Sequence, residues 1–168
     1  MVTGALRYGK TVEVAGLVIA VGLCVGVGAL GSVWTAESVR GWYAALAKPP
    51  ITPPGWVFAP VWTTLYILMG FAAWRVWRKA RFGGASATLI LFCIQLALNL
   101  AWSYLFFGRH WIGLALADIA TLVCAITATA VLFARIDRLA AWMLVPYLAW
   151  VTYASALNAW IWVLNRPG

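Results

Sequence analysis

The chain has 168 residues, of which 65% are hydrophobic and only 10% are charged, and it contains twelve tryptophans. A water-soluble domain of this size cannot bury so much apolar surface, so the composition excludes an ordinary soluble protein. The formal net charge of +8 resides mainly in short connections between apolar runs, a distribution that disfavours nucleic-acid binding.

Uncharged runs recur along the chain, and a helix needs roughly 20 apolar residues to cross a membrane. The runs are Val14–Ala36, Pro49–Trp74, Phe82–Gly108 and Leu139–Asn165, and a further run, Trp111–Ala134, is interrupted only by Asp118. They predict an all-α integral membrane bundle of five transmembrane helices, one domain over residues 1–168. The expected spans are about 12–34, 56–77, 86–107, 111–134 and 139–164. The first run is longer than a signal-peptide core, so we expect it to be retained.

The first span is rich in glycine, and Gly22 and Gly26 form a GxxxG pair of the kind that permits close helix packing in lipid. A long Pro-rich first loop, residues 35–55, is expected to follow it. Its four prolines should make it stiff, and a loop of this length is often functional. The later connections are short, with tight turns at 108–110 and 135–138.

Lysine and arginine are distributed unevenly between the two sides of the predicted membrane. The N-terminal side carries eight and the opposite side four. The eight are Arg7, Lys10, Arg75, Arg78, Lys79, Arg81, Arg135 and Arg138. This bias predicts a cytoplasmic N-terminus.

Polar and aromatic residues inside the spans fall on shared helix faces. Gln95, Asn99 and Trp102 are spaced i, i+4 and i+7, and so are Trp62, Tyr66 and Met69. A face of the last span carries Trp150, Ala154, Leu157 and Asn158. Asp118 should face the bundle interior or be protonated, because a charged carboxylate is costly in the membrane.

Two interpretations of the tryptophans stay open at this point. Those near span ends fit the aromatic belts that membrane proteins form at the lipid–water interface. Trp62, Trp102 and Trp150 lie further inside and align with polar neighbours, so together with Tyr66 they would line a cavity suited to a flat aromatic ligand.

Other kinds of site are poorly supported. Cys24, Cys93 and Cys124 lie inside spans without ligand-like spacing, and we expect neither disulfides nor a metal site. His110 is the only histidine and falls in a tight turn, so neither a catalytic triad nor a histidine-based metal site is expected.

Several motifs together resemble one known family. They are WYAALAKP at Trp42–Pro49, PPGWVF at Pro53–Phe58, VWTTLY at Val61–Tyr66, QLALNLAWS at Gln95–Ser103, FFG at Phe106–Gly108, PYLAW at Pro146–Trp150 and LN at Leu157–Asn158. The sequence is similar to the tryptophan-rich sensory protein, or translocator protein, family (TspO/MBR), formerly called the peripheral benzodiazepine receptor family. The match extends from about Trp42 to Asn165.

The resemblance implies a membrane receptor or sensor that binds tetrapyrroles (protoporphyrin IX or haem) and related hydrophobic ligands, without a required cofactor. Its implied function is to influence porphyrin transport, breakdown or signalling. The ligand-binding positions that it implies are Trp42, Tyr43, Pro53, Trp62, Tyr66, Asn99, Trp102, Asp118, Trp150, Ala154 and Leu157.

The alternatives are a light- and oxygen-dependent porphyrin-degrading enzyme, in which Trp62 and Trp150 would be catalytic, and a porphyrin or sterol transporter. Specific cholesterol binding is disfavoured, because Ala159 and Val163 occupy the tyrosine and arginine positions of the animal motif. Ala97 and Ala101 form a small-xxx-small pair that would permit a homodimer. The strongly basic character of the chain and its short tail suggest a bacterial member of the family, in a bacterial membrane.

Overall fold

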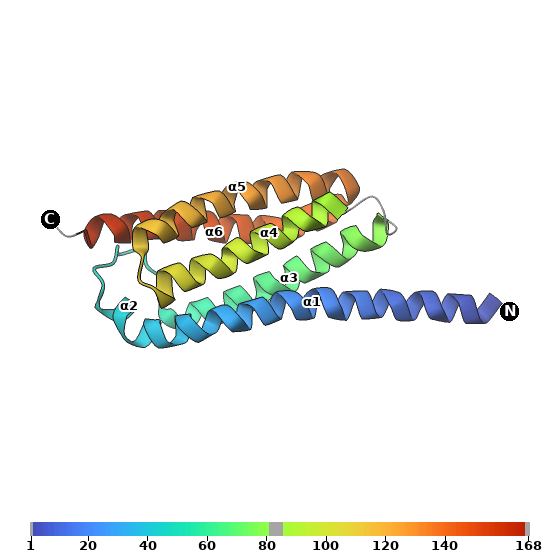
Figure 1. Cartoon of the computed structure of the whole chain (residues 1–168), viewed down its shortest axis with the longest axis horizontal. Helices are drawn as coiled ribbons and strands as arrows, with labels where there is room; N and C mark the ends of the chain where they lie inside the picture. Colours follow the sequence, from blue (N-terminus) through green and yellow to red (C-terminus); the bar gives the residue numbers. More distant parts are fainter. Residues whose placement is uncertain (1, 81–85, 167–168) are drawn as a thin grey trace.

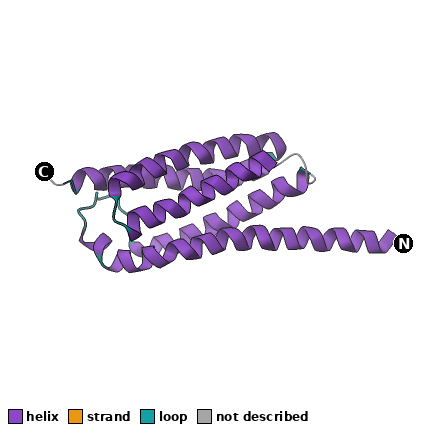
Figure 2. Ribbon diagram, in the orientation of Figure 1, coloured by secondary structure: helices purple, strands orange, loops and turns teal. Residues whose placement is uncertain are grey.

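The computed structural model describes residues 2–80 and 86–166, in which every regular element is helical (Figure 2). Five long helices are α1 (Val2–Arg40), α3 (Phe58–Lys79), α4 (Ser86–Ser103), α5 (Ile112–Ile136) and α6 (Arg138–Leu164). The short elements are α2 (Trp42–Ala45), the 3-10 turn η1 (Gly55–Val57) and the π-helical turn η2 (Tyr104–Gly108).

In the described part of the chain, five helical segments are long and apolar enough to cross a membrane, which confirms the predicted five-span bundle. The long helices run side by side, and α1 extends past its neighbours at its N-terminal end (Figure 1). Helix α1 packs against α3 and α4, while α5 packs against α4 and α6. Helix α6 also packs against α3 and so completes the bundle.

The first helix is longer than the predicted span of about 12–34. Helix α1 continues to Arg40 instead of ending near Trp34, and it already includes Val2. The hydropathy pattern locates the part of a helix that lies in lipid, whereas exposed charged residues such as Glu37 and Arg40 can extend the helix into water. As a result the predicted 35–55 connection is shorter than expected, because α2 and η1 occupy parts of it and only Gly41 and residues 46–54 are non-helical.

Glycines bring α1 and α3 close together, but they are not the predicted pair. Gly22 and Gly26 are exposed, and a Cβ added at either would meet nothing within 4 Å. A Cβ on Gly70 would lie 2.6 Å from Val21 Cα, and one on Gly28 would lie 2.4 Å from the Tyr66 ring. The α1–α3 contact therefore depends on Gly70 and Gly28, and the expectation that Gly22 and Gly26 mediate packing is wrong within this chain.

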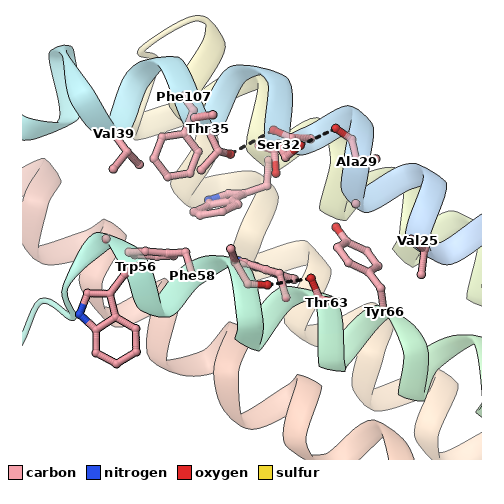
Figure 3. Close-up of a pocket in the computed structure, with 18 of the residues that line it drawn as sticks. Val25, Ala29, Ser32, Thr35, Val39, Trp56, Phe58, Thr63, Tyr66 and Phe107 are labelled. Carbon is pink, nitrogen blue, oxygen red and sulfur yellow. Dashed lines mark hydrogen bonds between the residues drawn. The ribbon is translucent and has the colours of Figure 1, made fainter.

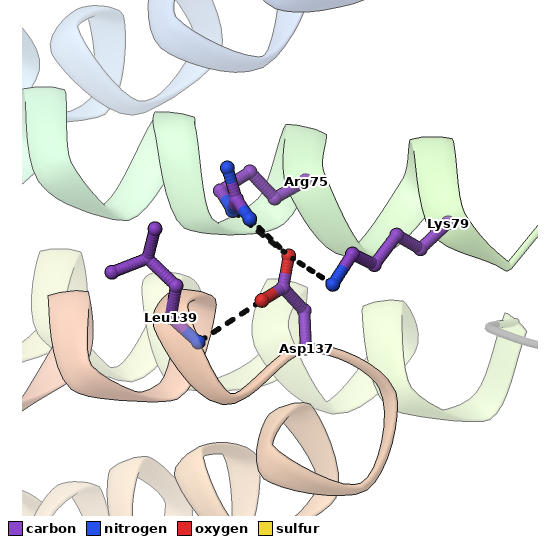
Figure 4. Close-up of polar contacts among 4 residues, drawn as sticks. All are labelled: Arg75, Lys79, Asp137 and Leu139. Atoms are coloured by element: carbon purple, nitrogen blue, oxygen red, sulfur yellow. Dashed lines mark hydrogen bonds and ion pairs between the residues drawn. The ribbon is translucent and has the colours of Figure 1, made fainter.

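Asp137 ties three helices together at the end of the bundle where α5 meets α6 (Figure 4). Its carboxylate lies 2.8 Å from Arg75 and 3.2 Å from Lys79, both on α3. It also accepts a 3.0 Å hydrogen bond from the backbone N–H of Leu139, which caps α6. Arg75 and Lys79 thus pair with Asp137, and Arg78 lies 3.8 Å from Glu13 on α1. Arg81, the fourth basic residue of this connection, lies outside the described residues.

We predict that Asp137→Asn lowers the melting temperature at neutral pH and removes an acid-sensitive part of the stability. Burial alone would raise the pKa of the Asp137 carboxyl, but the hydrogen bonds from Lys79 and Leu139 and the charges of Arg75 and Lys79 outweigh it and lower the pKa. This stabilisation is present above the unfolded-state pKa of about 3.9 and is lost as pH falls through the lower folded-state pKa. Thermal unfolding at several pH values should show a shallower acid dependence for the variant, and parallel curves would contradict the prediction.

Candidate functional site

A cavity of about 680 Å³ lies between α1, α3 and the junction of α4 with η2 (Figure 3). Its aromatic lining comes from six residues: Trp56, Phe58, Trp62, Tyr66, Trp102 and Phe107. Helix α1 supplies most of the small and aliphatic lining, including Val25, Gly28, Ala29, Ser32, Thr35 and Val39. One side of the cavity is therefore formed by flat aromatic rings, and the other side is a helix surface with small side chains.

The position of Tyr66 explains where the cavity ends. The Tyr66 ring packs directly on Gly28, so α1 and α3 are in contact at this level. Tyr66 is also a lining residue, and the other lining positions of α3 precede it towards η1. The Tyr66 hydroxyl donates a hydrogen bond to Asn99 Oδ1 on α4. The Trp62 ring stacks on the Tyr66 ring, with 5.6 Å between the ring centroids. Tyr66 thus forms a fixed floor for the cavity.

Trp102 is held in place by the last helix. Its indole Nε1 donates a 3.0 Å hydrogen bond to Asn158 Oδ1 on α6. The Asn158 amide Nδ2 in turn donates to the Ile112 carbonyl at 3.0 Å. The Trp102 ring also stacks on Phe106 at 5.4 Å. Its polar edge is satisfied inside the bundle, which leaves its ring available as a wall of the cavity.

The π-helical turn η2 and helix α2 cover the bundle beyond Trp102. Trp42 packs edge-on against Phe106, and the Tyr43 ring contacts both Phe106 and Phe107. On its other side Trp42 stacks on His110 at 4.0 Å with an interplanar angle of 15°. His110, which was predicted to fall in a tight turn, is exposed and has a positive φ of 61°. The aromatic residues of α2 are thus a roof above Trp102 rather than part of the cavity lining.

Hydrogen bonds fasten the loop after α2. Lys48 Nζ donates to the carbonyls of Tyr43, Ala44 and Leu46 and so closes the end of α2. Asn165 at the end of α6 makes a two-way contact with Ala47, accepting from its N–H at 3.1 Å and donating to its carbonyl at 2.9 Å. The loop is therefore attached to α6 by specific bonds as well as stiffened by its prolines.

The polar groups of the cavity wall are few. Ser32 and Thr35 on α1 and Thr63 on α3 donate their hydroxyls to carbonyls of their own helices. Their remaining capacity is to accept hydrogen bonds. Arg40, the last residue of α1, is exposed and brings a positive charge to the cavity edge. An apolar ligand with an acidic group would contact the aromatic lining with its apolar part and the charge of Arg40 with its acidic group.

The structure brings three of the predicted ligand-binding residues into the cavity lining: Trp62, Tyr66 and Trp102. Asn99 lies directly behind the floor. The others lie elsewhere: Trp42 and Tyr43 in the roof, Pro53 in the loop, Asp118 on α5, and Trp150, Ala154 and Leu157 on α6. Trp150 packs edge-on against Phe58, a lining residue, at 6.1 Å. The expected convergence of three indoles on one cavity holds for Trp62 and Trp102 but not for Trp150.

Sequence reasoning missed the α1 wall. Gly28, Ser32, Thr35 and Val39 are spaced i, i+4, i+7 and i+11, which places them on one helix face. That periodicity was available in the sequence, but the expected end of the helix near Trp34 assigned its second half to a loop. Because a helix wall built of small residues carries no aromatic or charged signal, composition alone did not point to it.

Comparisons with known proteins agree with this architecture. The model of the TspO/MBR family matches residues 20–163. "Tryptophan-rich protein TspO" of Chlorobaculum tepidum is 42% identical over 157 residues, covering 91% of this chain and 98% of that protein. "Translocator protein" of Homo sapiens is 44% identical over 134 residues, covering 77% and 78%. "Tryptophan-rich sensory protein" of Cereibacter sphaeroides is 41% identical over 117 residues, covering 70% and 72%. The chain is a multi-pass integral membrane protein that belongs to the TspO/MBR family.

Proposed function

We propose that this protein is a membrane receptor or sensor whose ligand is a tetrapyrrole such as protoporphyrin IX or haem, bound in the cavity between α1 and α3. The observation that carries the proposal is one cavity of about 680 Å³ with six aromatic rings in its lining and an arginine at its edge. This volume is within the range of about 300–1,000 Å³ that is usual for small-molecule sites.

The chemistry of the lining suits a flat, apolar macrocycle that carries carboxylates. Stacking and burial against Trp62 and Trp102 would supply most of the affinity, because aromatic rings gain from offset and edge contacts with other π systems. The opposite wall carries small side chains at Ala29 and Ser32, which leaves room for a broad planar ligand. The propionate groups of a porphyrin would then extend towards Arg40 and water.

The orientation of the protein in the membrane predicts the side from which the ligand enters the cavity. The cavity is lined mainly by the second half of α1, by η1 and by the first half of α3. These parts lie at the α2 end of the bundle, and the turn between α5 and α6, which contains Asp137, lies at the opposite end (Figure 1). Basic residues favour the cytoplasmic side of a membrane, so the Asp137 end would face the cytoplasm. Ligand would therefore enter the cavity in the outer half of the membrane, where the exposed Trp56 marks its edge.

The contribution of Arg40 can be tested with a matched pair of ligands. Arg40→Gln should weaken protoporphyrin IX binding about two- to fivefold, the effect of one exposed ion pair. Binding of the dimethyl ester, which has no carboxylates, should be unchanged by the substitution. Tryptophan fluorescence quenching, with the full-length protein in lipid nanodiscs, measures both affinities. An equal loss for the acid and the ester would remove Arg40 from the site, and no saturable quenching by either ligand would reject the proposed function.

A further inference from the structure

The cavity between α1 and α3 is open along its length on the side that faces the membrane. Its inner wall includes the buried residues Tyr66 and Trp102. Its rim consists of exposed residues, namely Val25, Ala29, Ser32 and Ala36 on α1 and Ala59 and Thr63 on α3 (Figure 3). Their spacing of i, i+4, i+7 and i+11 on α1 and i, i+4 on α3 puts each set on one helix face. The cavity is therefore a slot that a ligand can enter sideways from the lipid.

The slot extends through one half of the membrane. The uncharged run of α1 begins at Val14 and ends at Ala36, and its midpoint is Val25, at one end of the slot. Arg40, at the other end, follows Val25 by fifteen residues, which is about 22 Å of helix. Half of a hydrocarbon core is about 15 Å thick. The slot thus begins near the middle of the bilayer and ends at the lipid–water boundary.

The slot carries a positive charge at one end only. Arg40 is the one charged residue of the lining, and Arg40 is exposed. Among the described residues, the ion pairs are those of Asp137 and Glu13, and none of them includes Arg40. The hydroxyls of Ser32 and Thr35 donate to carbonyls of their own helix. The slot is therefore mainly apolar along its length, with a free guanidinium where it reaches water.

We propose that this slot binds a long-chain fatty acid, with its carboxylate at Arg40 and its acyl chain extending towards Val25. One chain with one negative charge matches one narrow slot with one arginine, and a guanidinium pairs well with a carboxylate. Arg40 lies one turn beyond Ala36, the last exposed apolar residue of the rim. The anionic group must therefore be attached directly to the chain, as in a fatty acid, whereas a phospholipid has a glycerol between the two.

The side chains around the slot suit an acyl chain. The small residues Ala29 and Ser32 let the chain lie close to α1, and the rings of Trp62 and Trp102 cover it from the inside of the bundle. Because the chain only exchanges lipid for protein, we expect the ion pair with Arg40 to select the ligand. The inference rests on the proposed function only in taking this cavity as the ligand site, and the fatty acid would compete with a tetrapyrrole for it.

The test uses palmitic acid with a photoreactive diazirine at mid-chain and the full-length protein in phosphatidylcholine nanodiscs, at alkaline pH so that the carboxylate is ionised. After illumination, peptide mass spectrometry should find the label within residues 25–36 of α1 and 59–66 of α3. An excess of unlabelled palmitic acid should reduce this labelling saturably. Methyl palmitate, which has the same chain without the charge, should compete about two- to fivefold less well.

Substitutions separate the charge from the shape of the slot. Arg40→Gln should make the acid and the ester compete equally, because it removes the positive charge. Ser32→Phe should reduce labelling in the slot at least about fivefold, since its ring fills the space that the chain needs. Val33→Phe is the matched control, because Val33 is 64% exposed and outside the lining, and it should keep the labelling. If Ser32→Phe does not fold, the comparison of acid with ester in the wild type decides the question.

Label spread evenly over the lipid-facing helices, without saturable displacement, would overturn the proposal. Equal competition by the acid and the ester in the wild type would also overturn it. Displacement by phosphatidylglycerol but not by palmitic acid would assign the slot to a phospholipid instead. Tetrapyrrole binding is measured separately by fluorescence quenching. Saturable labelling without porphyrin quenching would retain this inference and reject the proposed function, and quenching without labelling of the slot would do the reverse.

Discussion

Gly70→Ala is expected to destabilise the protein by about 1–3 kcal/mol, the usual cost of overpacking a close contact. The added Cβ would lie 2.6 Å from Val21 Cα and 3.0 Å from the Ala20 carbonyl oxygen, both backbone atoms of α1. A backbone atom cannot move aside as a flexible side chain can, so α1 and α3 must separate. Thermal unfolding in detergent, followed by circular dichroism, should show a melting temperature lowered by several degrees.

Gly22→Ala is the matched control for this substitution. It makes the same chemical change in α1, at a position where a new Cβ meets nothing within 4 Å. Alanine is the better helix former, so the variant should be unchanged or more stable by up to about 1 kcal/mol. If both variants lost equal stability, the close α1–α3 contact at Gly70 would not be what holds the two helices together.

Ser32→Phe should reduce protoporphyrin IX affinity at least about tenfold, a loss of about 1.4 kcal/mol. Ser32 lies on the α1 wall of the cavity, and a benzyl group there would occupy the space that faces the aromatic rings of α3. The substitution removes one hydroxyl that bonds to the Ala29 carbonyl of its own helix, so little stability is at risk. Tryptophan fluorescence quenching in nanodiscs measures the affinity, and the melting temperature shows whether the fold is intact.

Val33→Phe provides the comparison at the adjacent position. Val33 is 64% exposed and is not among the lining residues, so its larger replacement should face lipid and leave porphyrin affinity unchanged. A loss of affinity at Val33 equal to that at Ser32 would indicate a general disturbance of α1. Unchanged affinity in Ser32→Phe would show that the ligand does not occupy the cavity between α1 and α3.

The sequence was sufficient to predict the five spans, because uncharged runs of that length have few other structural solutions. The faces of α3 and α4 that carry Trp62, Tyr66 and Trp102 were also predictable, since helical periodicity and resemblance to a known family agreed on them. Both kinds of information depend on large or polar side chains, which leave a clear pattern in a sequence.

The rest of the site depends on how closely the helices approach one another. The residue pattern of a single helix does not reveal these distances. Gly22 and Gly26 match a packing motif, whereas the glycines in close contact with α3 are Gly16 and Gly28. Trp150 is on the predicted face of α6, but its ring packs against Phe58 of α3 and is not part of the cavity lining. Asp137 sits in a short turn, and only the fold shows that Arg75 and Lys79 reach it.

The most direct test of the central claim is a structure of the full-length protein in lipid with protoporphyrin IX bound. The macrocycle should lie between α1 and α3, in contact with Trp62 and Trp102, with a carboxylate near Arg40. A macrocycle on the α6 side of the bundle beside Trp150, with the space between α1 and α3 unoccupied by ligand, would contradict it.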